Sequence, residues 1–109
     1  MIFIIGGAYQ GKLTYAQQHF AEEYVIMNQY QLVVKEALKK GLNPLEEAKR
    51  LLEQQDKLVI ISDEMGCGIV PTDIFERQYR EASGRVNCYL AGQAEQVIRV
   101  ICGIGSRIA

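Results

Sequence analysis

The sequence predicts a small α/β domain of three layers, in which helices cover both faces of a mostly parallel β-sheet. Two apolar runs, at residues 1–5 and 57–62, lack the alternation of a half-exposed strand and are typical of strands buried on both faces. Apolar residues recur at helical spacing in the segments 13–21, 30–38, 45–52 and 75–90. A glycine-rich loop also joins the first strand directly to a helix. Alternation of strands with helices favours parallel strands with right-handed crossovers.

The loop after the first strand has the spacing G-x-x-x-x-G-K, from Gly6 through Gly11 to Lys12. In such a loop, backbone N–H groups surround phosphate oxygens and the lysine meets the terminal phosphates. The helix that begins near Gly11 adds its positive dipole end. The residues expected to bind the phosphates of a nucleotide are Gly6, Gly7, Ala8, Tyr9, Gln10, Gly11, Lys12, Leu13 and Thr14. A strand–turn–helix corner that has this spacing by chance is the alternative.

Position 13 departs from the motif, which has a serine or threonine there whose hydroxyl binds Mg²⁺. Leu13 has no ligand atom. Thr14 follows it, but the next residue on a helix points about 100° away. Thr14 therefore replaces the missing hydroxyl only if the loop shifts its register.

The segment between the two long strands contains a short apolar run and two amphipathic helices. Residues 24–27 are interpreted as a short second strand. Asn28, with Gln31 three residues later, predicts an N-cap and its reciprocal partner for a helix that Gly41 ends. Asn43, followed by a proline, predicts the N-cap of the next helix.

Two carboxylates, Asp63 and Glu64, directly follow the strand at residues 57–62. Ligands of open α/β sheets bind at the carboxyl ends of the strands, so both acids are expected on the same side as the glycine-rich loop. A carboxylate there can bind Mg²⁺ or accept the proton of a substrate hydroxyl. Lys12, Asp63 and Glu64 are therefore the expected catalytic residues, and the two acids are the expected Mg²⁺ ligands. An ordinary acidic turn is the alternative.

Residues 65–109 predict a loop, a long helix and a last strand. Residues 65–71 form a glycine-rich loop that ends in a proline, and Asp73 then predicts an N-cap. Gly84 interrupts the long helix at a cost of about 1 kcal/mol relative to alanine, which indicates close packing or the close approach of a partner. Residues 96–102 predict the last strand, and residues 103–105 are interpreted as a turn.

Composition and charge narrow the class of protein. The 109 residues, of which 49% are hydrophobic, are expected to form one domain over residues 1–109. A net charge of −1 with interspersed signs predicts neither a nucleic-acid nor a membrane surface. The three cysteines are odd in number, so they cannot all pair in internal disulfides, and they lack the paired spacing of a metal site; they are Cys67, Cys88 and Cys102. With no apolar run long enough to span a bilayer and no basic leader, the chain is expected in the cytoplasm.

Several runs are more specific than the phosphate loop. They are S-D-E-M-G-C-G-I-V-P at residues 62–71, Arg80, G-R-V-N at 84–87 and G-I-G at 103–105, together with Gly6, Gly7, Ala8, Gly11 and Lys12. Residues 1 to 20 and 57–109 thereby resemble the adenosylcobinamide kinase/adenosylcobinamide-phosphate guanylyltransferase family of cobalamin biosynthesis. The resemblance implies a RecA-like P-loop fold, with ATP or GTP as phosphoryl donor and the hydroxyl of a corrinoid, adenosylcobinamide, as acceptor.

The resemblance also assigns residues by position. It implies that Gly6, Gly7, Gly11 and Lys12 bind phosphates and that Glu64 lines the nucleotide or corrinoid side of the site. The substrate-side residues that it implies are Gly66, Gly68 and Arg85. Members of the family assemble into oligomers, which makes a homo-oligomer an expectation here.

The middle of the family's chain is largely missing from this sequence. That part contains the histidine that many members use to transfer GMP from GTP, and the single histidine here, His19, does not match its position. His19 is interpreted as an ordinary helical residue, and no guanylyltransferase activity is expected.

Three interpretations of function stay open. The chain is a compact kinase of the cobalamin pathway, a nucleotide- or corrinoid-binding protein without catalysis, or a P-loop kinase for another small alcohol. Lys12 and the two acids favour the first, whereas Leu13 and the missing middle favour the second. Turnover of nucleotide in the presence of adenosylcobinamide discriminates between them. No base-recognition motif selects ATP or GTP.

Overall fold

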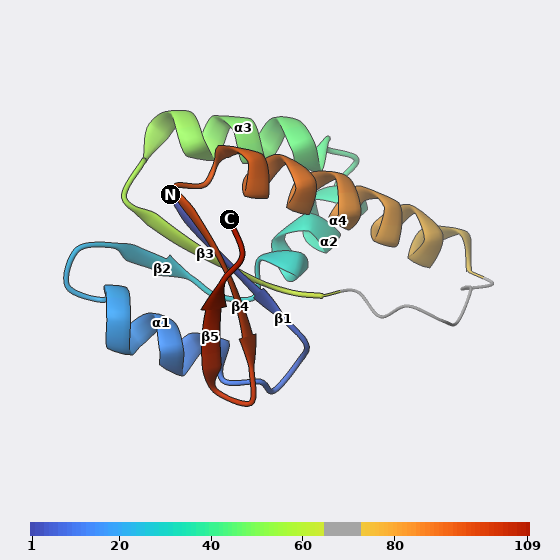
Figure 1. Cartoon of the computed structure of the whole chain (residues 1–109). Coiled ribbons are helices and arrows are strands. Elements are labelled where there is room, and N and C mark those ends of the chain that lie inside the picture. The colour runs from blue at the N-terminus through green and yellow to red at the C-terminus, as the bar shows by residue number, and fades with distance from the viewer. Residues whose placement is uncertain (65–72) are drawn as a thin grey trace.

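The computed structural model describes residues 1–64 and 73–109, which form five strands and four helices (Figure 1). The strands are β1 (Ile2–Gly6), β2 (Val25–Met27), β3 (Leu58–Asp63), β4 (Gln96–Ile101) and β5 (Ile104–Arg107). The helices are α1 (Lys12–Phe20), α2 (Tyr30–Lys39), α3 (Pro44–Gln54) and α4 (Ile74–Gln93). The predicted strands and helices are all present, and β5 is an addition to them.

The strands form one sheet in the order β2-β3-β1-β4-β5. β1 to β4 run parallel, and β5 is antiparallel to β4. β1 and β3 are direct neighbours, and their register places Gly6 opposite Asp63. The first residue of the glycine-rich loop and the acid at the end of β3 therefore lie side by side at one edge of the sheet.

The sheet separates two apolar clusters, because successive strand residues point to opposite faces. On one face, Ile4 and Ile61 pack with Ala16 of α1. On the other face, Phe3 and Ile60 pack in the cluster that α2, α3 and α4 complete. Figure 1 shows α1 on its own side of the sheet and the other helices across from it. The predicted three-layer α/β fold with a mostly parallel sheet is confirmed.

The end of the chain forms a hairpin that the sequence did not predict. Ile101 pairs with Ile104, so Cys102 and Gly103 form a two-residue connection with φ values of 50° and 77°. Positive φ at both positions is the geometry of a type I′ turn, which matches the twist of the strands that it joins. The interpretation of residues 103–105 as a turn is therefore wrong for Ile104 and Gly105, which are the first two residues of β5. Gly105 belongs to β5, where a Cβ would overlap the ring of Tyr15.

Two of the three predicted N-caps are present. The side chains of Asn43 and Asp73 each accept hydrogen bonds from two backbone N–H groups in the first turn of α3 and α4. The prediction for Asn28 is wrong, because α2 begins one residue later, after Gln29, which has a φ of 55° and makes no side-chain cap. Gln31 is consequently not a capping partner.

Gly84 does not mark close packing within the described chain. α4 continues through it from Ile74 to Gln93, and no atom lies within 4 Å of the position that a Cβ would take. The interpretation of Gly84 as a packing contact is wrong for the described residues, and the glycine leaves a gap on the helix surface.

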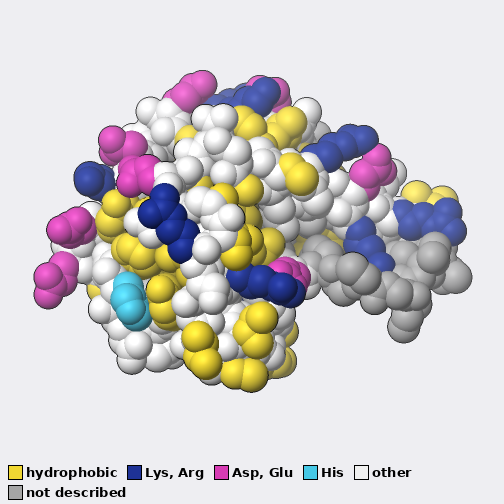
Figure 2. All heavy atoms as spheres, in the orientation of Figure 1, with side chains coloured by type: hydrophobic (Ala, Val, Ile, Leu, Met, Phe, Trp, Pro, Cys, Tyr) yellow, Lys and Arg dark blue, Asp and Glu magenta, His cyan; other side chains and the backbone are white. Residues whose placement is uncertain are grey.

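The surface carries charges of both signs. Figure 2 shows basic and acidic side chains interspersed on the face that it displays, with the histidine at its edge. Cys88 and Cys102 are both free and exposed. In residues 1–64 and 73–109, no helix has the length and apolar character needed to cross a membrane.

Candidate phosphate site

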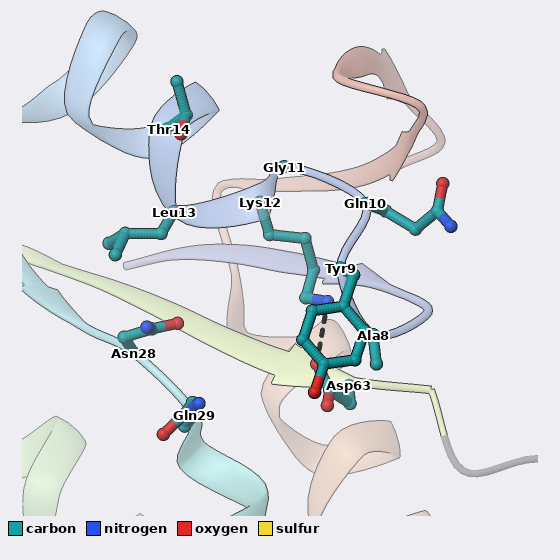
Figure 3. A pocket seen from close by; sticks show the side chains of 10 residues that line it. All are labelled: Ala8, Tyr9, Gln10, Gly11, Lys12, Leu13, Thr14, Asn28, Gln29 and Asp63. Atoms are coloured by element: carbon teal, nitrogen blue, oxygen red, sulfur yellow. Dashed lines mark ion pairs between the residues drawn. The ribbon is translucent and has the colours of Figure 1, made fainter.

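A cavity of about 280 Å³ lies where β1 and β3 end. Its wall consists of the end of the glycine-rich loop, the start of α1, the connection from β2 to α2 and the end of β3 (Figure 3). The lining residues are Ala8, Tyr9, Gln10, Gly11, Lys12, Leu13, Thr14, Asn28, Gln29 and Asp63. The structure thus brings the expected residues 8–14 together with Asp63. Gly6 and Gly7 are not among the lining residues.

The loop is curved, since Tyr9 and Gly11 both have positive φ, at 60° and 87°. Two glycines are required by close backbone neighbours. A Cβ on Gly6 would overlap the carbonyl oxygen of Val100, and a Cβ on Gly11 would lie 3.2 Å from the Cα of Gly103. No side chain caps the start of α1, so its first N–H groups remain available to an anion in the cavity.

Gln10 attaches the loop to the β4–β5 hairpin. Its backbone oxygen accepts a hydrogen bond from the N–H of Gly103, and its side-chain oxygen accepts one from the N–H of Cys102, both at 2.7 Å. Figure 3 shows the side chain of Gln10 directed away from Lys12. Gln10 therefore contributes its backbone to the cavity wall, while its carboxamide fixes the position of the loop.

Lys12 lies beneath the loop with only 6% of its side chain exposed. Its amine donates to the carbonyl oxygen of Gly7 at 2.5 Å and lies 2.7 Å from Oδ1 of Asp63. An amine buried to this extent requires such partners, because an unpaired buried charge is costly. The charge of Lys12 is thus paired with the carboxylate of Asp63 at the floor of the cavity.

Asp63 has a second partner on α2. Its Oδ2 accepts a hydrogen bond from Nε2 of Gln31 at 3.2 Å, and its own N–H donates to Oε1 of Gln31 at 3.2 Å. Each carboxylate oxygen of Asp63 is therefore engaged, one with Lys12 and one with Gln31.

Glu64 faces a different partner. Its two oxygens lie 2.8 Å from Nε and 3.1 Å from Nη2 of Arg99, a two-point ion pair between the end of β3 and β4. Glu64 is not among the residues that line the cavity. The structure thus brings Asp63 to Lys12, while Glu64 lies with Arg99.

The start of α1 offers little to a cation. Leu13 is 36% exposed and lines the cavity with an apolar side chain, and Figure 3 shows Thr14 pointing away from the amine of Lys12. Among the described residues, no group of three His, Cys, Asp or Glu side chains could hold a metal ion. Mg²⁺ usually binds one or two carboxylates together with substrate phosphates and water. These residues fit Mg²⁺ only if Asp63, released from Lys12, is its carboxylate ligand and the remaining ligands are substrate phosphates and water.

Of the predicted substrate-side residues, the structure describes Arg85, which is not among the residues that line this cavity. Gly66 and Gly68 lie outside the described residues. Arg85 lies on α4, 2.5 Å from Glu81, and lines a groove against α3.

Comparison with known proteins identifies the family. A family model described as CobU, cobinamide kinase/cobinamide phosphate guanyltransferase, matches residues 23–108. The chain belongs to the CobU family. Two similar proteins, the bifunctional adenosylcobalamin biosynthesis proteins CobU of Salmonella typhimurium and Escherichia coli, are each 44% identical to it over 52 residues. That stretch is 48% of this chain and 29% of each relative, so the match spans less than a third of their length. The family predicted from the motifs is confirmed.

Sequence reasoning missed two residues of this CobU-family chain. Arg99 had a usable signal, because it is a single charge in the apolar run of β4. Gln31 had a misleading one, because its spacing from Asn28 imitates a capping pair.

Proposed function

We propose that this chain binds the triphosphate of ATP or GTP in the cavity and transfers the γ-phosphoryl group to the hydroxyl of adenosylcobinamide. The observation that carries the proposal is the position of Lys12, whose amine lies between the glycine-rich loop and Asp63 at the cavity floor. Membership of a family described as cobinamide kinases supports the choice of acceptor.

The residues of the cavity suit the parts of a phosphoryl transfer. Backbone N–H groups of the loop and of the start of α1 bind the phosphates, and the amine of Lys12 turns from Asp63 to the terminal phosphate. The acceptor oxygen attacks the γ-phosphorus, the bond to the β,γ-bridging oxygen breaks, and the nucleoside diphosphate leaves. The hydroxyl proton passes to water, because Oδ2 of Asp63 is engaged by Gln31 and the freed Oδ1 would hold the cation. Mg²⁺, when bound, neutralises charge on the phosphate oxygens.

A second candidate function is favoured by one observation. Leu13 places an apolar side chain where phosphate loops have a hydroxyl ligand for Mg²⁺. A protein that binds a nucleotide or corrinoid without catalysis does not need that ligand. Such a protein would have a regulatory or assembly role.

Transfer of labelled phosphate distinguishes the two functions. The chain is incubated with γ-labelled ATP or GTP, Mg²⁺ and adenosylcobinamide, and the corrinoid is separated by chromatography. The kinase labels the corrinoid, Lys12→Met abolishes the labelling, and Lys49→Met on the surface of α3 leaves it unchanged. Nucleotide binding without transfer favours the second function, and absence of binding overturns the phosphate site.

A further inference from the structure

Gln31 makes a paired contact with the acid at the floor of the cavity. It lies in the first turn of α2 and is 8% exposed. Its carboxamide donates to Oδ2 of Asp63 and accepts from the N–H of the same residue, both at 3.2 Å. The bond to Oδ2 has to break before the carboxylate turns, and the bond from the backbone N–H of Asp63 holds the carboxamide in place to make it.

The backbone of Gln31 is itself held in place. The hydroxyl of Tyr79 on α4 donates to the carbonyl oxygen of Gln31 at 2.9 Å, and this bond is buried. The contact between Gln31 and Asp63 therefore joins β3 to the helices packed on that face of the sheet. It also leaves Oδ1 of Asp63 directed at Lys12.

We propose that Gln31 is a positioning residue of the phosphate site, which holds the Asp63 carboxylate against the amine of Lys12. A phosphate group must then displace this carboxylate to reach the lysine. A polyphosphate that carries Mg²⁺ supplies a cation to Asp63 in exchange for Lys12. A metal-free polyphosphate instead meets a lysine that is already paired with a carboxylate, whose negative charge repels the phosphates. Gln31 thereby makes phosphate binding dependent on the metal. This consequence for ligands rests on the proposed function, whereas the effect on Lys12 does not.

The free protein tests the effect on Lys12 directly. Gln31→Met keeps the length and helix propensity of the side chain and removes both hydrogen bonds. Acylation of individual lysines by an activated ester is followed by mass spectrometry, with Lys49 as the internal reference. We expect Lys12 to react about fivefold faster in Gln31→Met, the equivalent of one net hydrogen bond of about 1 kcal/mol. An unchanged ratio of Lys12 to Lys49 overturns the proposal.

Amide hydrogen exchange measured by NMR supplies a second readout in the same protein. The N–H of Asp63 donates to the side chain of Gln31, whereas that of Glu64 donates to the backbone oxygen of Gly6. Gln31→Met should accelerate exchange at Asp63 and leave Glu64 protected. If the variant does not fold, the wild type decides, because an Asp63 amide that exchanges at the unprotected rate overturns the contact.

Calorimetry with inorganic tripolyphosphate tests the consequence for ligands. In Gln31→Met we expect metal-free affinity to rise by about fivefold and the gain from added Mg²⁺ to shrink, since Asp63 competes less for Lys12 and is less well placed for the cation. General damage to the fold lowers both affinities, and that result overturns the proposal. If the wild type binds no tripolyphosphate, the proposed function fails, and lysine reactivity and amide exchange decide the role of Gln31.

Discussion

Replacement of Lys12 by methionine is expected to act on both phosphate binding and stability. The side chain of Lys12 is 6% exposed, and its amine lies 2.7 Å from the carboxylate of Asp63, whose side chain is 32% exposed. A charge-assisted contact is worth about 1.5–3 kcal/mol, so metal-free tripolyphosphate should bind about 10- to 140-fold more weakly. The partly exposed Asp63 can regain water, so the loss of folding stability should be smaller, about 1–2 kcal/mol.

The double variant Lys12→Met/Asp63→Asn separates the loss of the cation from the repulsion by Asp63. With Lys12 absent, an asparagine can direct its oxygen at Nε2 of Gln31 and its amide at the ligand. We expect the double variant to bind metal-free tripolyphosphate more tightly than Lys12→Met, because a carboxylate facing the phosphates is gone.

Isothermal titration calorimetry measures the affinities, and urea unfolding measures the stabilities. Lys49→Met, which removes a surface lysine of α3, should change neither. Wild-type affinity in Lys12→Met would refute the assignment of Lys12 as a phosphate ligand. A double variant that binds no more tightly than Lys12→Met would refute the competition between Asp63 and phosphate.

Four further outcomes are expected. Leu13→Ser should increase the Mg²⁺ dependence of nucleotide binding in calorimetry, because it restores a hydroxyl ligand; no change would mean that another oxygen already serves the metal. His19 lies outside the phosphate cavity, with Nδ1 2.9 Å from the carbonyl oxygen of Tyr15, so incubation with α-labelled GTP should leave no base-stable label on the protein. Gly84→Ala should raise the free energy of unfolding by about 1 kcal/mol in urea, whereas Gly41→Ala, at a φ of 74°, should lower it by about 1 kcal/mol. Burial, with a smaller contribution from Glu76, raises the pKa of the Tyr79 hydroxyl above 10.0. The neutral hydroxyl therefore contributes stability below pH 10.0, and this contribution is lost as the pH rises through the raised pKa. The alkaline decline of stability should therefore be shallower in Tyr79→Phe, and an equal decline would contradict that assignment.

The fold was predictable because its main elements are specified locally. Unbroken apolar runs identify β1 and β3, and Asn43 and Asp73 mark the starts of α3 and α4 by the hydrogen bonds that they accept. β5 was not predictable in the same way. Its turn contains Cys102 at a φ of 50°, where asparagine or aspartate would have indicated a type I′ hairpin.

The site was predictable only as far as chain order and strand ends define it. A parallel sheet places the carboxyl ends of β1 and β3 on the same side, and the register of the two strands brings the loop to Asp63. The partners of the charged groups depend on tertiary contacts that no spacing encodes. Asp63 and Glu64 are adjacent in the sequence, yet alternation along the strand sends one to Lys12 and the other to Arg99.

The curvature of the glycine-rich loop is maintained by contacts within the protein. Gln10 holds it to the β4–β5 turn, and the pair formed by Lys12 and Asp63 holds its end to β3. A ligand that enters such a loop does not have to order it, which lowers the conformational cost of binding. The cost lies instead in separating Lys12 from an acid that Gln31 keeps in place. Selectivity among phosphate compounds should therefore follow their ability to replace both members of this ion pair, which a polyphosphate with a bound cation can do and a single phosphate group cannot.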